Sequence, residues 1–203
     1  MVRVIESASS AQRVEAARAF LAALPAAEGA LVVGATRTAA DDLVRWVTAT
    51  AGATFGIHRM SLTQLAAQVA APEMARLGTA PASALGAEAV AARVIFEALS
   101  AGALGYFAPV ARFPGFARAV ASTLGELRLA QISPEALGAT CTPTASGQGA
   151  SHASQDVAEL LTRFDAVLGT GALADRRALF ELALSALSAD PPPAIARVPL
   201  VLL

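Results

Sequence analysis

The chain has 203 residues, a formal net charge of −1 and a pI near 6.1, so it lacks the basic character of a nucleic-acid-binding protein that acts alone. It is 55% hydrophobic with a mean hydropathy of +0.56. No apolar run approaches the roughly 20 residues that span a bilayer, and we therefore expect no membrane segment. All 15 basic residues are arginines, because the chain contains no lysine.

The N-terminus predicts a short strand and a helix. Residues 2–5 alternate as a strand does, and residues 11–24 carry an amphipathic helical pattern. Glu6 and Glu15 lie where a signal peptide needs an apolar core, which argues against secretion. Cys141 is the only cysteine, so no internal disulfide can form, and this fits a reducing compartment. These features together predict a cytoplasmic protein.

Residues 29–46, GALVVGATRTAADDLVRW, predict a strand, a tight turn and a helix, and the rest of the chain is organised around them. Residues 30–33 form a short apolar run that is typical of a buried strand. The turn is expected at residues 34–38, and the helix at residues 39–46. Strand, turn and helix in this order form the phosphate sites of many α/β proteins, since the free N–H groups of the turn and the helix N-terminus favour anions.

The helix predicted after this turn has an apolar and a polar side. Leu43, Val44 and Trp46 are expected on the buried side, while Asp41 and Asp42 are expected to face outward. Acidic residues are favoured in the first turn of a helix by its dipole. Adjacent carboxylates point to different sides of a helix, so we do not interpret this pair as catalytic.

The turn has the setting of a phosphate site without the usual chemistry. A Walker A loop requires a second glycine, a lysine and a hydroxyl residue, but Ala39 and Ala40 stand at the positions of the last two. We therefore expect no bound cofactor and no ATP binding of the usual kind. Two interpretations stay open: a structural turn, or a degenerate phosphate- or DNA-binding turn formed by Gly34, Thr36, Arg37 and Thr38.

A second strand-to-helix junction is predicted in the sequence FGIHRMSLTQLAAQVA, where residues 55–59 form a strand and Ser61 starts a helix. If the two strands are parallel, both junctions open at the same edge of the sheet. In one interpretation Arg59, Ser61 and Thr63 contact the phosphates of single-stranded DNA. In the other, Ser61 caps the helix and Arg59 is a solvated side chain.

The pattern changes after residue 72, where helices follow one another without a convincing strand. Helical patterns cover residues 84–100, 106–130 and 152–168, and residues 140–154 are predicted to form a mobile surface loop. Asp175 is expected to cap a last helix. The aromatic residues of the middle segment, which could stack on bases or fill a helical core, are Tyr106, Phe107, Phe113 and Phe116.

No metal site is expected, because His58 and His152 lack cysteine or carboxylate partners at ligand spacing. The chain is predicted to close with an apolar strand at residues 195–203 that returns to the sheet and stops without a turn, which indicates truncation at the last strand.

These elements predict an α/β fold with a parallel sheet made of residues 2–5, 30–33, 55–58 and 195–202. The predicted division is a first part of the α/β domain at residues 1–71, an all-helical insertion at residues 72–188 and a returning strand at residues 189–203.

The sequence resembles the N-terminal region of AddB-type proteins, the B subunits of bacterial helicase–nucleases of the PD-(D/E)XK nuclease family. The resemblance covers nearly the whole chain, and its most specific part is FPGFARAVASTLGELRLA followed by ISPEAL. The other segments that carry it are VVGATRTAADDLVRW, FGIHRMSLTQLAAQVA, LGAEAVAARVIFEAL, DVAELLTRFDAVL and LADRRALFELAL. The resemblance implies a RecA-like, P-loop NTPase-like sheet with a large helical insertion. In that family the nuclease domain, with its Fe–S cysteines where present, follows at the far C-terminus.

Two functional hypotheses follow. The first is a non-catalytic, helicase-like region of a DNA double-strand-break repair helicase–nuclease. Such a region would guide single-stranded DNA and dock a helicase partner subunit and the C-terminal nuclease domain. The second is a stand-alone nucleotide- or phosphate-binding α/β protein. The absence of a lysine and of the second glycine favours the first.

Overall fold

The structure, a computed structural model, describes residues 3–25, 28–139 and 148–203. The chain forms two compact units. We call the first the sheet unit, made of Met1–Pro72 and Leu182–Leu203, and the second the helical unit, made of Glu73–Glu181. The helices α3 (Leu62–Leu77) and α8 (Arg176–Leu187) each contain a boundary between the units. No described helix is both long enough and apolar enough to cross a bilayer.

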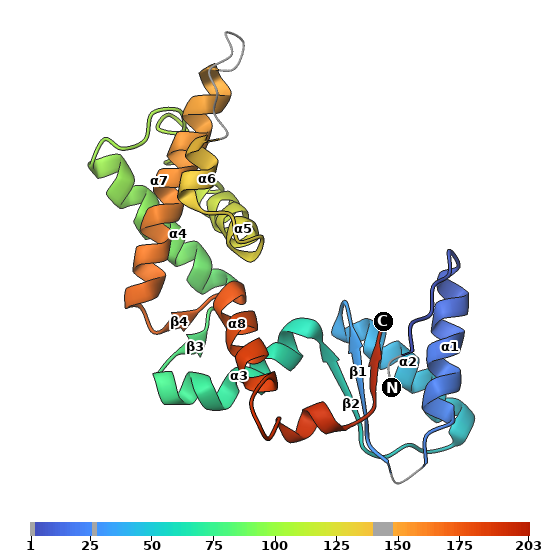
Figure 1. Ribbon diagram of the computed structural model, residues 1–203. Helices are drawn as coiled ribbons and strands as arrows, with labels where there is room; N and C mark the ends of the chain where they lie inside the picture. The colour runs from blue at the N-terminus through green and yellow to red at the C-terminus, as the bar shows by residue number, and fades with distance from the viewer. Residues whose placement is uncertain (1–2, 26–27, 140–147) are drawn as a thin grey trace. The chain divides into compact units, whose positions relative to one another are not determined.

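The sheet unit is built on three parallel strands in the order β2-β1-β5 (Figure 1). They are β1 (Ala30–Gly34), β2 (Ile57–Ser61) and β5 (Leu200–Leu202). The central strand β1 is buried at every position, as its continuous apolar run predicts. The α/β class and the parallel pairing of these three strands are therefore confirmed.

Two helices, α1 (Ser10–Ala22) and α2 (Arg37–Ala51), build one core with a face of the sheet. The core includes Leu21, Val32, Leu43, Val44, Val47 and Val201. The expectation that Trp46 faces inward is wrong, because Val47 fills that position and Trp46 is 36% exposed. The Trp46 ring instead lies under the guanidinium of Arg18, 4.1 Å from its centroid.

Three predicted strands differ from the structure. The strand expected at residues 55–58 is β2 at Ile57–Ser61, because the positive φ of Gly56 (73°) interrupts extended backbone before it. Residues 3–5 form no strand and are exposed, since an alternation this short gives no energy without a neighbouring strand to pair with. Residues 1–2 lie outside the described residues. The final strand is shorter than expected because Ala194–Arg197 form a 3-10 helix, η1, and strand pairing begins only after Pro199.

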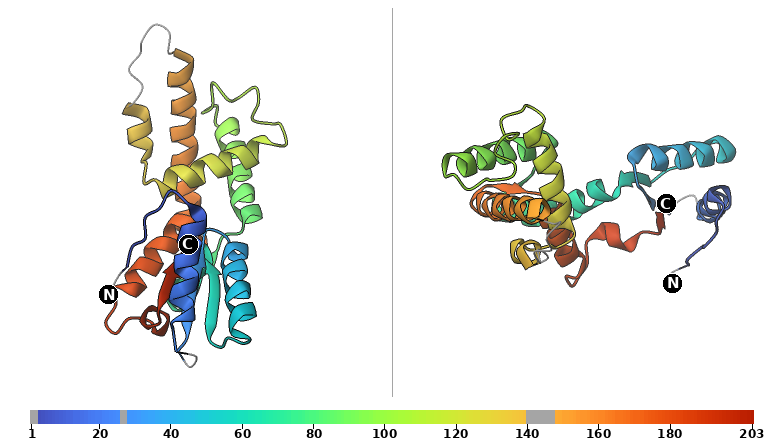
Figure 2. Two further views of the ribbon diagram at one scale, coloured as in Figure 1. Left: turned by 90° about the vertical axis from the view of Figure 1, so that its right-hand side faces the viewer. Right: turned by 90° about the horizontal axis from the view of Figure 1, so that it is seen from above.

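The helical unit packs α4 (Ala84–Ser100), α5 (Phe116–Leu129) and α7 (Gln148–Thr170) around a second core. In the left view of Figure 2, α5 crosses both α4 and α7, and all three pairs are in contact. The short helix α6 (Pro134–Ala139) packs against α7. The largest fully buried side chains of this core are Phe164, Leu124, Leu160, Leu161 and Val94.

This region is not all-helical. Two strands of two residues each, β3 (Ala80–Pro81) and β4 (Leu173–Ala174), pair in parallel. Residues 106–115, predicted as helix, form turns, and residues 148–154, predicted as loop, belong to α7. Residues 148–154 contain no proline and one glycine, so their composition permits the early start of α7. The rest of the predicted loop, with Cys141, lies outside the described residues.

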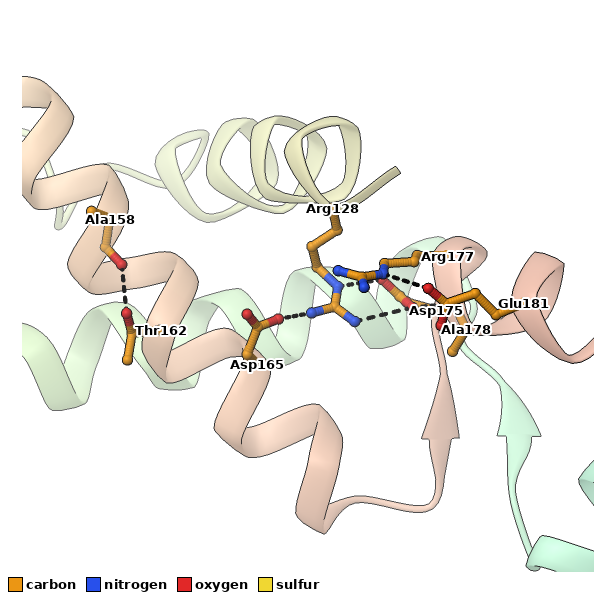
Figure 3. Close-up of polar contacts among 8 residues, drawn as sticks. All are labelled: Arg128, Ala158, Thr162, Asp165, Asp175, Arg177, Ala178 and Glu181. Carbon is orange, nitrogen blue, oxygen red and sulfur yellow. Dashed lines mark hydrogen bonds and ion pairs between the residues drawn. The ribbon is translucent and has the colours of Figure 1, made fainter. Parts of the chain in front are cut away.

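One polar cluster ties the elements of the helical unit together (Figure 3). The guanidinium of Arg128 on α5 contacts Asp165 on α7, and its Nε donates to Asp175 Oδ2 at 2.6 Å. Asp175 also caps α8 by accepting from the backbone N–H of Ala178 at 3.0 Å. The side chains of Arg128 and Asp175 are only 13% and 11% exposed, so this cluster fixes three elements rather than offering a site.

Candidate phosphate and nucleic-acid site

The junction between β1 and α2 is shorter than a phosphate-binding loop. Gly34 ends the strand, and only Ala35 and Thr36 separate it from the helix. A Cβ atom on Gly34 would lie 2.8 Å from the backbone oxygen of Thr36 and 3.2 Å from the nitrogen of Ala40. Thr36 caps the helix, since its Oγ1 accepts from Ala39 N at 3.2 Å. Glycine is therefore required here by backbone packing alone.

The sequence predicts Arg37 and Thr38 in the turn. In the structure they are instead the first two residues of α2. The helix starts early because Thr36 is an effective N-cap residue. Both side chains are exposed, and the N–H groups of a first helical turn have no intrahelical acceptor. This end of α2 therefore presents partial positive charge together with one guanidinium.

The junction between β2 and α3 has no connecting residue at all. Ser61 is the last residue of β2 and directly precedes Leu62, the first of α3. Its Oγ accepts from Gln64 N at 3.2 Å, while Gln64 Oε1 accepts from Ser61 N at 2.9 Å. These two bonds form a capping box. Thr63 lies exposed in the same first turn.

The register of the sheet brings both junctions to one edge. Gly34 pairs with Ser61, so the last residues of the two strands are neighbours. Arg59 pairs with Val32, and side chains at paired positions point to the same face of a sheet. Val32 packs in the core shared with α2, and Arg59 accordingly extends toward that helix.

Asp41 on α2 joins the two arginines of this edge. Its Oδ1 lies 3.6 Å from Arg59 Nε, and its Oδ2 lies 3.9 Å from Arg37 Nε. Both contacts are loose, and the arginine side chains remain 44% and 58% exposed. The cluster keeps one positive charge in excess. The neighbouring Asp42 turns to Arg45 instead, at 2.8 Å, so the adjacent carboxylates diverge as predicted.

A cavity of about 350 Å³ opens beside this cluster, in the sheet unit. It is lined by Arg37 from α2, residues 57–60 of β2, and Gln64 and Gln68 of α3. The sequence interpretation did not include the two glutamines. Their spacing of four residues, which places both on one side of α3, is the signal that could have found them. Guanidinium and amide groups around one cavity suit a phosphate-bearing ligand.

The other candidate residues of the sequence analysis do not line this cavity. His152 is exposed on α7, and the described residues contain no group of three or more histidine, cysteine or acidic residues that could hold a metal. Of the four aromatic residues, Phe107 and Phe116 are partly buried against each other at 5.6 Å, whereas Tyr106 and Phe113 are exposed.

No protein-family model matches the chain, and no curated protein matches its sequence.

Proposed function

We propose that this chain is a non-catalytic, helicase-like segment that guides single-stranded DNA, as the N-terminal region of a DNA double-strand-break repair helicase–nuclease. The observation that carries the proposal is the pairing of Gly34 with Ser61, which sets two helix N-termini at one edge of a parallel sheet. Arg37 and Arg59 flank one cavity there, and their charge exceeds that of Asp41. Phosphate oxygens are the ligands that such an edge favours.

The proposed partners follow from the resemblance of the sequence to the N-terminal region of AddB-type proteins. A helicase partner subunit would supply ATP-driven movement, and a C-terminal nuclease domain of the parent protein would supply cleavage. The net charge of −1 supports a dependent role, because a chain without an overall basic surface binds DNA weakly on its own.

The test is a fluorescence-anisotropy titration of a labelled single-stranded oligonucleotide at low salt. Arg59→Ala should weaken DNA binding. Added salt should weaken DNA binding by the parent protein, because phosphate contacts release counterions. Arg45→Ala is the matched control, since Arg45 pairs with Asp42 on the same helix and does not line the cavity. Equal curves for the parent and Arg59→Ala would remove this site from the proposal.

A second candidate function is supported by the cavity itself, whose volume of about 350 Å³ falls within the range of small-molecule sites. In that case the ligand is a free nucleotide or phosphate. Titration with ATP and with inorganic pyrophosphate separates the two functions. Saturable binding of either, with no binding of the oligonucleotide, would favour the second.

A further inference from the structure

The link between α4 and α5 is a folded loop held by a buried charge. Asp156 of α7, which is 5% exposed, accepts from Gly105 N at 3.1 Å and from Phe107 N at 2.8 Å. The backbone is thus fixed on both sides of Tyr106. A buried carboxylate is costly unless it is well hydrogen-bonded, so these two bonds hold the loop firmly in place.

Further contacts close the loop into a compact shape. The N–H groups of Val110 and Ala111 donate to Phe107 O, that of Phe113 donates to Val110 O, and that of Phe116 donates to Phe113 O. The Phe107 and Phe116 rings meet at 5.6 Å and close its base. Residues 105–116, which we call the aromatic loop, therefore have a defined conformation.

This rigid frame holds large apolar side chains out in solvent. Tyr106 is 52% exposed, Phe113 is 66% exposed and Val110 is 41% exposed. The Tyr106 ring meets Phe107 at 5.0 Å and 90°, so it forms the exposed end of the aromatic group at the base of the loop. Aromatic rings that are fixed and exposed are what single-stranded nucleic acids use as stacking platforms.

The segment that carries these rings is positively charged in its own sequence. Residues 98–125 contain two arginines and no acidic residue. Arg112 precedes Phe113 in the aromatic loop, and Arg118 lies in the first turn of α5. Both are exposed, and no carboxylate of the described residues lies within ion-pair distance of either. The other arginines of this unit all have such a partner: Arg76, Arg93, Arg128, Arg163, Arg176 and Arg177.

We propose that the aromatic loop and Arg118 form a separate contact site for single-stranded nucleic acid in the helical unit. Tyr106 and Phe113 stack on bases, while Arg112 and Arg118 neutralise phosphates. The proposal does not rest on the Arg37–Arg59 cavity, because the two sites share no residue and lie in different units.

The chain offers a signal specific to this site, because Tyr106 is its only tyrosine and Trp46 its only tryptophan. The whole chain with Trp46→Phe is titrated with oligothymidylate of about 15 nucleotides, a length that exceeds most single binding sites. An abasic strand of equal length is titrated in parallel. Oligothymidylate should quench the Tyr106 emission and the abasic strand should not, because only bases stack.

Three variants in this background sharpen the test. Phe113→Ala should weaken oligothymidylate binding about tenfold, in line with the loss of one stacked base. Phe55→Ala is the matched control, since Phe55 is 86% exposed but belongs to the sheet unit, and it should change nothing. Arg59→Gln should leave the quench at saturation intact even if it lowers overall affinity, which separates this site from the cavity.

Several outcomes would overturn the proposal. Binding of oligothymidylate without a change in Tyr106 emission would show that the strand does not reach the loop, and the absence of binding would remove the site altogether. Equal affinities for the parent and Phe113→Ala would do the same. A Tyr106 signal that changes with protein concentration in the absence of DNA would identify the loop as a contact between copies of this chain instead.

Discussion

Asp41 is the residue that determines how freely the cavity of the sheet unit can accept an anion. It contacts both Arg37 and Arg59, and it is the acidic member of that cluster. Asp41→Asn should tighten binding of single-stranded DNA about fivefold at low salt, because a unit charge at contact distance changes the energy by roughly 1 kcal/mol in water. Anisotropy titrations measure this change directly.

Asp42→Asn is the control, since it makes the same change of charge on the next residue, where the carboxylate pairs with Arg45. If the two variants bind DNA equally well, the effect is one of net charge, and the Arg37–Asp41–Arg59 cluster has no specific role.

Glu135 provides a pH-dependent observable in the helical unit. The Ser133 hydroxyl, and then the backbone N–H of Glu135 itself, lower the pKa of this carboxyl below its ordinary value. Because the pKa is depressed in the folded state, the stabilising effect on α6 is present above the unfolded pKa and is lost as the pH falls through the folded one. Ser133→Ala should raise the pKa of Glu135 toward its ordinary value in an NMR titration.

Glu73 is the internal reference for that titration. Its pKa is also lowered, but by a hydrogen bond from Arg76, and Ser133→Ala should leave it unchanged. A Glu135 titration identical in the parent and the variant would show that the hydroxyl does not act on this carboxyl.

At the scale of elements, the stability of two variants tests whether Ser61 acts mainly as a helix cap. Ser61→Ala removes the acceptor for Gln64 N and should lower the free energy of unfolding by about 1 kcal/mol. Thr63→Ala, in the same first turn, should cost less than about 0.5 kcal/mol, as is usual for exposed positions. Urea unfolding followed by Trp46 fluorescence reports on the sheet unit. Similar losses for both variants would argue against the cap as the main role of Ser61.

The Arg128 cluster is expected to contribute more to stability than an exposed ion pair does. Arg128→Met should destabilise the helical unit by about 3 kcal/mol, because it leaves the largely buried Asp175 without its charged partner. Arg93→Gln breaks the exposed pair with Glu97 and should cost about 0.5 kcal/mol or less. Denaturation followed by circular dichroism measures both. A small loss for Arg128→Met would mean that the cluster is well solvated.

Long elements and local caps could be predicted from the sequence, whereas contacts between elements could not. The buried run of β1 and the helix start at Ser61 are local signals, and both agree with the structure. The contact between Arg59 and Asp41 depends on the register of β1 against β2, and no local sequence pattern determines that register. The two-residue strands β3 and β4 are too short for any periodicity to show.

For the molecule as a whole, the question is whether the β1–α2 junction, which is placed like a nucleotide-binding turn, can hydrolyse a nucleotide. Two features of the structure argue that it cannot. Two residues join β1 to α2, whereas a Walker A motif places four between its glycines, so this backbone cannot wrap a triphosphate. The Thr36 hydroxyl already accepts from Ala39 N, which reduces its use as a magnesium ligand.

We therefore predict that the chain alone does not hydrolyse ATP. Phosphoryl transfer depends on positioned charge, supplied by a lysine, a magnesium ion and the acid that holds it. The chain has no lysine, and Arg37, at the start of α2, is directed to Asp41. A planar guanidinium is a poor substitute for a compact ammonium in a phosphate cradle. Phosphate release by the purified chain with Mg-ATP and single-stranded DNA should stay at background. Turnover that persists through repurification and is lost in Arg37→Ala or Thr38→Ala would show that this junction is catalytic after all.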